Sequence, residues 1–210
     1  MQKEKVLVLG GTQMIGRDFV ETIQKTNQEY ELYIANRGIT NKDLFPNLNK
    51  ICIDRNNKES CSILSKYIFD IVIDFSCYNI TQYCNTIDYL TYKKYVLIST
   101  QSVLDTNTLN KKNSSDPYYW YCLYKKELED YIKSKNTEMI IVRPGAVYGH
   151  NDYTGRFECK DGEFYWKNTN TKVSDTKGCI SIKALTDYLI SNVIRIDIKN
   201  QNNYQILQIP

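Results

Sequence analysis

Apolar residues occur in short continuous runs, and these runs alternate with segments of helical periodicity. The first run, residues 6–9, has four apolar residues with no polar alternation, which is typical of a parallel strand covered on both faces. Ile15, Phe19 and Ile23 follow at every fourth position and indicate a helix. The alternation predicts an α/β protein with a doubly wound parallel sheet. Similar apolar runs predict further strands over residues 31–35, 50–53, 70–75, 95–98, 139–142 and 204–207.

The segments between these strands complete the predicted architecture. The polar stretch 105–116 has no periodicity and predicts a flexible loop. A length of 210 residues suits one domain with at most a small appendage. We therefore assign residues 1–150 to the main domain and 151–210 to a reduced substrate-facing segment, whose final helix and strand return to the main domain. Helical patterns cover residues 62–67, 80–90, 121–133 and 182–193.

A glycine-rich turn separates the first strand from the first helix. Gly10 and Gly16 flank the start of that helix, where backbone N–H groups can approach a pyrophosphate closely. The alternative is a tight turn without a ligand, and a single glycine motif does not decide between the two. On the first interpretation, the cofactor contacts in this turn are Gly10, Thr12, Gln13, Met14, Ile15 and Gly16.

Polar residues follow the second and third strands. In a dinucleotide-binding fold the end of the second strand meets the adenosine ribose. Asn36 and Arg37 stand there and favour the 2′-phosphate of NADP over NAD, because a guanidinium matches phosphate geometry. A solvated surface arginine is the alternative. Asp54, which precedes Arg55, either accepts a hydrogen bond from adenine or begins a turn.

Hydroxyl groups follow the fifth strand, and an aromatic run opens the next helix. Residues 99–102 are polar where an open sheet has its ligand crevice, although such side chains also cap strand ends. Tyr121 and Lys125 lie four residues apart on one helix face, where an ammonium can stabilise a phenolate. Because the chain has 18 tyrosines, the same spacing also fits an ordinary amphipathic helix.

Composition and charge disfavour several classes of protein. The chain has 27 basic and 24 acidic residues, a net charge of +3, and no basic stripe of the kind that binds nucleic acid. No apolar run approaches the roughly 20 residues of a membrane span, so we expect a cytoplasmic protein. Seven cysteines without a C-x-x-C pair and a single histidine disfavour a disulfide framework and a metal site.

Four motifs follow one another along the chain: Gly10-Gly11-Thr12-x-x-x-Gly16, Ser99-Thr100, Tyr121-x-x-x-Lys125-x-x-x-Glu129 and Arg143-Pro144-Gly145-x-x-Tyr148-Gly149. Their order and spacing resemble those of the extended short-chain dehydrogenase/reductase family, which comprises NAD(P)-dependent nucleotide-sugar epimerases, dehydratases and reductases. The resemblance covers residues 1–155 well and the remainder loosely. It implies a Rossmann-type fold that binds NADP or NAD.

The resemblance also implies roles for individual residues. Thr100, Tyr121 and Lys125 would form the catalytic trio: Tyr121 exchanges a proton with the substrate oxygen, Thr100 binds the same oxygen and Lys125 holds the nicotinamide ribose. Asp54 would face adenine. A homodimer would form through the Tyr121 helix and the helix that follows the fourth strand. The remaining cofactor contacts would be Phe75, Ser76, Cys77, Pro144 and Gly145.

Three departures from the family pattern narrow the prediction. Gln13 replaces the usual middle glycine of the phosphate loop, and the chain after Gly145 is short for a complete nucleotide-sugar pocket. Gln101 and Ser102 stand where 4,6-dehydratases carry Asp-Glu, which disfavours dehydration. We therefore expect an NAD(P)-dependent oxidoreductase or epimerase that acts on a carbinol or keto carbon of a nucleotide-activated sugar. The alternative is a non-catalytic dinucleotide-binding regulator or an RNA-binding relative.

Overall fold

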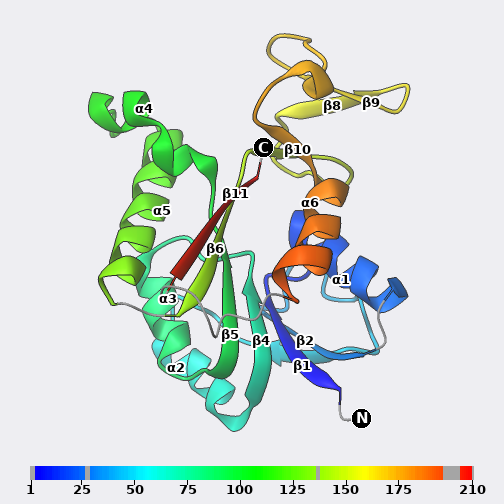
Figure 1. The fold of residues 1–210 in the computed structure, drawn as a ribbon, viewed down its shortest axis with the longest axis vertical. Coiled ribbons are helices and arrows are strands. Elements are labelled where there is room, and N and C mark those ends of the chain that lie inside the picture. Colours follow the sequence, from blue (N-terminus) through cyan, green and yellow to red (C-terminus); the bar gives the residue numbers. More distant parts are fainter. Residues whose placement is uncertain (1–2, 27–28, 136–137, 196–203, 210) are drawn as a thin grey trace.

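A parallel sheet of seven strands runs through the described part of the protein, in the order β11-β6-β5-β4-β1-β2-β3 (Figure 1). The computed structural model describes residues 3–26, 29–135, 138–195 and 204–209. Strand order reverses between β1 and β4, so the predicted doubly wound parallel sheet is confirmed. The strands are β1 Glu4–Leu9, β2 Tyr30–Asn36, β3 Asn49–Cys52, β4 Ile68–Asp74, β5 Thr91–Ile98, β6 Met139–Pro144 and β11 Tyr204–Ile209.

Two hydrophobic cores lie on the two faces of this sheet. Successive residues of a strand point to opposite faces, so β1 supplies both cores. Its valines pack in the core that contains residues of α1 (Met14–Thr26) and α6 (Ile182–Tyr188), and its leucines pack in the core that contains residues of α3 (Ile80–Ile87) and α5 (Pro117–Ser134). Figure 1 shows these two pairs of helices on opposite sides of the sheet.

The segment between β5 and α5 differs from the sequence prediction. Part of the expected flexible loop forms α4 (Thr106–Lys111), because the Asp105 carboxylate caps it by accepting hydrogen bonds from the N–H and hydroxyl of Thr108. The following helix begins at Pro117, before Tyr121, because Asp116 accepts from the N–H of Tyr118 at 2.8 Å and proline suits a first helical turn.

Residues after β6 form small elements before they return to the sheet. β7 (Ala146–Tyr148) pairs with β10 (Cys179–Ser181), and β8 (Phe157–Lys160) with β9 (Glu163–Trp166) as an antiparallel hairpin. Helix α6 then packs against α1, and β11 joins the sheet beside β6. The remaining short helices are α2 Lys58–Cys61, η1 Ser62–Lys66, η2 Gln101–Leu104, η3 Val173–Asp175 and a π-helical turn, η4 Leu189–Val193. None of the helices in the described ranges is long and apolar enough to cross a membrane.

Candidate functional site

The turn between β1 and α1 presents unpaired backbone donors at the carboxyl edge of the sheet. Gly10 donates its N–H to the carbonyl of Ala35 at 3.2 Å, which ties the turn to β2. Residues 10–12 form a turn, and within the described chain the N–H groups of Gly11, Thr12 and Gln13 make no hydrogen bond of standard geometry to a protein acceptor. Because these N–H groups precede a helix of 13 residues, they suit an anionic group such as a pyrophosphate.

Two glycines make this turn sterically feasible. Gly10 has φ +85°, and a Cβ there would lie 2.7 Å from Cβ of Ser76. A Cβ on Gly16 would lie 2.2 Å from the carbonyl oxygen of Gly10, so glycine lets α1 approach the strand end. Met14 has φ +42°, and its side chain and that of Ile15 pack against the core. Both side chains are only partly buried, so their exposed part and the backbone are available to a ligand.

At the end of β2, the Asn36 side chain hydrogen-bonds to other described residues, whereas the Arg37 guanidinium does not. The Asn36 amide donates to the hydroxyl of Thr12 at 3.3 Å and accepts from the N–H of Gly38 at 2.8 Å. Asn36 therefore holds the glycine turn in place, and its contact with the ribose stays a prediction. Arg37 is exposed, and within the described chain its guanidinium has no partner. Arg37 is therefore the residue available for a 2′-phosphate.

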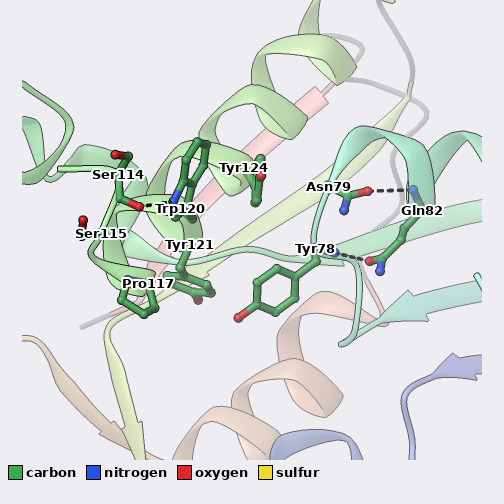
Figure 2. A pocket seen from close by; sticks show the side chains of 9 residues that line it. All are labelled: Tyr78, Asn79, Gln82, Ser114, Ser115, Pro117, Trp120, Tyr121 and Tyr124. Carbon is green, nitrogen blue, oxygen red and sulfur yellow. Dashed lines mark hydrogen bonds between the residues drawn. The ribbon is translucent and has the colours of Figure 1, made fainter. Parts of the chain in front are cut away.

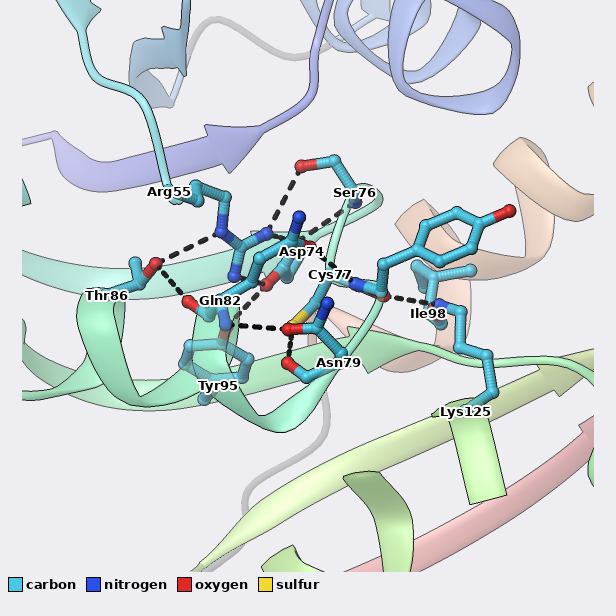
Figure 3. A network of polar contacts seen from close by, with 11 residues as sticks. Arg55, Asp74, Ser76, Cys77, Asn79, Gln82, Thr86, Tyr95, Ile98 and Lys125 are labelled. Carbon is cyan, nitrogen blue, oxygen red and sulfur yellow. Dashed lines mark hydrogen bonds and ion pairs between the residues drawn. The ribbon is translucent and has the colours of Figure 1, made fainter. Parts of the chain in front are cut away.

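A buried ion pair fixes the end of β4 (Figure 3). The Asp74 carboxylate accepts two hydrogen bonds from the Arg55 guanidinium, at 2.8 and 2.7 Å, one from the Tyr95 hydroxyl at 2.6 Å and one from the N–H of Ser76 at 3.0 Å. Burial alone would raise the pKa of Asp74, but Arg55 and these hydrogen bonds hold it below its usual value. The network positions the loop that follows β4.

The same network corrects the prediction for Arg55. Its guanidinium pairs with Asp74, because a buried carboxylate requires a partner, and it is not open to a cofactor. It also donates a hydrogen bond to the hydroxyl of Thr86 at 3.0 Å. Cys77 is fully buried and its carbonyl accepts from the Lys125 ammonium, so its contact with a cofactor stays a prediction. Asp54 accepts from the N–H of Asn56 at 3.0 Å, as expected if it begins a turn, and its contact with adenine stays a prediction.

The predicted catalytic residues come together from two elements. Thr100 follows β5, and its hydroxyl accepts from the N–H of Ser102 at 3.1 Å. Thr100 lies close enough to Tyr121 on α5 to act on the pKa of its phenol. One turn further along α5, the buried Lys125 ammonium donates to the carbonyls of Cys77 at 2.7 Å and Ile98 at 3.0 Å. A hydroxyl, a phenol and an ammonium therefore lie at the carboxyl ends of β4 and β5.

The charge states of this group follow from burial. Burial raises the pKa of Tyr121 to about 12, although the neighbouring Thr100 hydroxyl and the charge of Arg156 each act to lower it. Burial also lowers the pKa of Lys125. The sequence predicts that Lys125 keeps the phenol acidic, but Lys125 gives two of its three donors to backbone carbonyls. Tyr121 is thus a neutral phenol near pH 7.

A second buried ion pair holds α5 against the sheet. The Glu129 carboxylate accepts from the hydroxyl of Ser99 at 2.6 Å and from the guanidinium of Arg143, which it also meets as an ion pair. Ser99 follows β5 and Arg143 belongs to β6, so one carboxylate on α5 fixes both. This contact sets the position of Tyr121 relative to Thr100. Beside it, Gly145 donates its N–H to the carbonyl of Ile209 at 3.1 Å.

A cavity of about 500 Å³, here called the Tyr121 pocket, opens beside the catalytic group (Figure 2). Tyr78 forms part of its wall, with its ring edge-on to that of Tyr121 at 5.6 Å between centroids. Tyr78, Trp120 and Arg156 are not among the site residues predicted from the sequence. The available signals were the position of Tyr78 after a buried strand and the aromatic run in the first turns of α5. The pocket is lined by Tyr78, Asn79, Gln82, Ser114, Ser115, Pro117, Trp120, Tyr121 and Tyr124.

The described residues contain no cluster of side chains that could bind a metal ion, and their cysteines are free thiols. Among the described residues, no three His, Cys, Asp or Glu side chains lie close enough together to hold a metal ion. All seven cysteines are free thiols, and of these only Cys77 lies on the loop next to the catalytic group. The site is therefore built from hydroxyl, phenol, ammonium and backbone groups.

Comparison with solved structures shows that the fold is shared with short-chain dehydrogenases/reductases. A wide-type member from Veillonella parvula in complex with NADP is 11% identical, with a TM-score of 0.67 and coverage of 98% of this chain and 93% of that one. The dTDP-glucose 4,6-dehydratase of Bacillus anthracis in complex with NAD is 15% identical, with a TM-score of 0.65 and coverage of 98% and 75%. The UDP-N-acetylglucosamine 4-epimerase of Methanobrevibacter ruminantium, in complex with UDP-N-acetylmuramic acid, is 16% identical, with a TM-score of 0.65 and coverage of 100% and 77%. No family model and no curated protein sequence matches the chain.

Proposed function

We propose that the protein is an NAD(P)-dependent oxidoreductase or epimerase that acts on a carbinol or keto carbon. The observation that carries this proposal is the proximity of Thr100 and Tyr121, next to Lys125, at the carboxyl edge of a doubly wound sheet. These three groups come from a strand end and a helix, so their proximity depends on the tertiary fold. Open α/β sheets bind ligands at this edge.

The residues around the glycine turn suit a nicotinamide dinucleotide. When bound, such a cofactor supplies or accepts a hydride. The N–H groups of Gly11, Thr12 and Gln13 would hold the pyrophosphate. The exposed Arg37 would hold a 2′-phosphate, so we favour NADP over NAD. Ser76 lies against Gly10 of the turn, where it would contact the cofactor, and Gly145 stays a predicted cofactor contact.

The protonation state of Tyr121 favours ketone reduction over alcohol oxidation. A phenol with a pKa of about 12 is protonated near pH 7, so it can give its proton to a substrate oxygen as the carbonyl carbon receives hydride. Thr100 would donate a hydrogen bond to the same oxygen and share the charge that develops there. Lys125 would use its third donor on the nicotinamide ribose.

A nucleotide-activated sugar is the substrate class that we propose to test first. One structural neighbour is a sugar-nucleotide epimerase crystallised with a UDP-linked sugar. In this chain, Arg156 comes from the segment that follows β7, and its charge acts on Tyr121, so a phosphate could bind on that side. We also propose a homodimer that forms through α3 and α5, as the resemblance implies.

The test is the substitution Tyr121→Phe. It removes one hydroxyl, so folding and NADPH affinity should stay unchanged while turnover of an accepted keto sugar nucleotide falls by roughly 10²–10⁴-fold. Calorimetric titration of NADPH and a steady-state assay on the same preparation measure both quantities. Tyr119→Phe, on the same helix outside the pocket lining, is the matched control and should retain full turnover.

Two results would contradict the proposal. Wild-type turnover in Tyr121→Phe would refute the assignment of Tyr121 as the proton donor. Wild-type protein that binds NADPH but converts no keto or carbinol compound would favour the non-catalytic regulator instead.

A further inference from the structure

We infer that the hydroxyl groups of Thr100, Ser102 and Tyr118 form a relay that returns a proton from solvent to Tyr121 after each turnover. This inference rests on the proposed function, in which Tyr121 gives its proton to the substrate oxygen. The phenolate that remains must regain a proton before the next substrate is reduced. The inference adds two positioning residues, Ser102 and Tyr118, which act through Thr100 and not on the substrate.

Three side-chain hydroxyls are linked by hydrogen bonds at the end of β5. The phenol of Tyr118 donates to the hydroxyl oxygen of Ser102 at 3.1 Å, and the hydroxyl of Thr100 donates to the same oxygen at 3.1 Å. Ser102 also donates its backbone N–H to the hydroxyl of Thr100 at 3.1 Å, which fixes these two residues relative to each other. At the inner end, Thr100 lies close enough to Tyr121 to act on its phenol. The hydroxyl relay therefore leads from Tyr118 to the proposed proton donor.

Tyr118 connects the hydroxyl relay to solvent. Tyr118 is 44% exposed, whereas Thr100 at the inner end is 6% exposed. The Asp116 carboxylate accepts from the N–H of Tyr118, and the Tyr118 ring stacks on that of Tyr121 with centroids 6.3 Å apart, so both contacts hold its phenol near Ser102. Burial of part of the ring raises the pKa of Tyr118, so its phenol is protonated near pH 7 and able to donate. A proton can thus enter at Tyr118 and reach a buried hydroxyl.

The buried Lys125 does not extend toward solvent in the same way. Its ammonium donates to the carbonyls of Cys77 and Ile98 (Figure 3), and a carbonyl oxygen has no proton to pass on. A hydroxyl group, in contrast, can accept one proton and donate another at the same time. Thr100 and Ser102 therefore suit the transfer of a proton, whereas the two partners of Lys125 do not.

The hydroxyl relay moves one proton in each turnover. During reduction, the Tyr121 phenol gives its proton to the carbonyl oxygen while hydride adds to the carbonyl carbon, which leaves an alcohol and a phenolate. Thr100 then gives its proton to the phenolate as it accepts one from Ser102, and Ser102 accepts one from Tyr118. Tyr118 takes a proton from solvent, so every group regains its starting state and no alkoxide forms. Hydroxyl hydrogens rotate, so Thr100, which donates to Ser102 in the free protein, can turn its O–H toward Tyr121.

The test compares the first turnover with later turnovers in Tyr118→Phe and Ser102→Ala. The full chain is mixed with excess NADPH and a keto probe, either UDP-4-keto-6-deoxyglucose or 2,3-butanedione, and stopped-flow absorbance follows the oxidation of NADPH. Because Tyr121 is protonated at the start, the first turnover does not need the relay. Each variant should therefore complete it at the wild-type rate. Later turnovers should be about tenfold slower than in wild type, a smaller loss than in Tyr121→Phe, because the proton donor itself is still present.

A small proton donor in solution should replace a missing hydroxyl. Imidazole added to Tyr118→Phe or Ser102→Ala should restore the later turnovers in proportion to the concentration of its protonated form, and it should leave wild type unchanged. Ser102→Thr keeps a hydroxyl and should need no imidazole.

Matched controls remove hydroxyls that lie outside the relay. Tyr119→Phe changes the next residue of α5, and Ser62→Ala changes an exposed serine at the start of η1. Both should keep wild-type rates in the first and in later turnovers.

Three results would overturn the inference. Unchanged later turnovers in either Tyr118→Phe or Ser102→Ala would mean that Tyr121 regains its proton directly from water, and the proposed oxidoreductase would stand. A first turnover slowed as much as later ones, without rescue by imidazole, would show that these residues only hold Thr100 in position. Wild-type protein that binds NADPH but reduces neither probe would count against the proposed function and overturn the relay with it.

Discussion

Neighbouring side chains at the end of β2 have different tasks. The Asn36 side-chain amide donates to the hydroxyl of Thr12 and accepts from the N–H of Gly38, and so it holds the glycine turn in place. Arg37 has no such commitment and is exposed to solvent. A residue that makes few internal contacts can give a large part of its interaction energy to a ligand, so cofactor choice should depend on Arg37.

Replacing Arg37 should therefore change which dinucleotide binds. Arg37→Ala removes a charge-assisted contact of about 1.5–3 kcal/mol to the 2′-phosphate, so NADPH should bind about ten- to a hundredfold more weakly and NADH equally well. Titration of both cofactors by calorimetry measures this. Lys42→Ala, another exposed cation in the following loop, is the control. If NADPH and NADH already bind wild type with equal affinity, Arg37 has no role in selection.

At the residue scale, the sequence predicts side-chain chemistry better than side-chain availability. The spacing of Tyr121 and Lys125 indicates one helix face, and the structure has both on α5. The fate of Arg55 could not be predicted, since its partner Asp74 is 19 residues away and meets it only after the sheet has formed. Burial of Cys77 likewise depends on packing between distant elements.

Helix α1 lies unusually close to the end of β1, and one atom explains why. The missing Cβ of Gly16 leaves room for the carbonyl oxygen of Gly10, which would otherwise lie 2.2 Å away. The contact is between backbone groups, so no side-chain rotation can relieve a clash there. The position of the whole helix, and of its free N–H groups, depends on this residue.

Gly16→Ala should consequently affect stability and cofactor binding together. Moving α1 away from the strand costs about 1–3 kcal/mol of unfolding free energy, as overpacking does in other cores, and displaces the donors expected to hold pyrophosphate. Urea unfolding and NADPH titration measure the two effects. Gly162→Ala, in the β8–β9 turn, adds the same Cβ at a position with no atom within 4 Å and should leave NADPH affinity intact. Normal affinity in Gly16→Ala would contradict this account of the turn.

Strands with a continuous apolar pattern were predictable from the sequence. A helix that depends on one capping residue was not. The seven strands of the sheet correspond to apolar runs, because burial on both faces leaves a continuous signal in the sequence. Helix α4 depends on a single capping carboxylate at Asp105, and its polar residues carry no periodicity. The Tyr121 pocket escaped prediction for a related reason, since its walls come from α5 and from the loop before α3.

Across the whole molecule, two buried ion pairs stiffen the ligand edge of the sheet. Arg55 and Asp74 join the segment after β3 to the end of β4, and Glu129 with Arg143 joins α5 to β6. The catalytic group lies between these two pairs. Its geometry is therefore set by the folded chain before any ligand binds.

The ion pair of Arg55 and Asp74 should make the unfolding free energy depend on pH. The folded-state pKa of Asp74 is depressed, so its stabilisation is present above the unfolded value of about 3.9 and is lost as pH falls through the folded pKa. Asp74→Asn should lower the unfolding free energy near pH 7 by about 3–5 kcal/mol, because Arg55 is left as an unpaired buried charge.

Urea unfolding between pH 7 and pH 2 measures this effect, and the variant should lose less stability than wild type as the solution is acidified. Asp88→Asn removes the exposed partner of Lys58 and should change the unfolding free energy by less than about 1 kcal/mol. Equal effects of the two substitutions would show that burial does not set the contribution of Asp74.

The Arg55 and Asp74 pair also limits how this sequence can vary over evolutionary time. A lineage that loses either residue alone passes through a protein with an unpaired buried charge, and selection against unfolding should remove most such intermediates. The two positions should therefore be inherited as one unit and be replaced together, for instance by two apolar residues. The Arg37 guanidinium has no partner among the described residues, so this position can change by itself. On the role proposed for Arg37, cofactor preference should drift by single substitutions, while the Arg55 and Asp74 pair changes only as a unit.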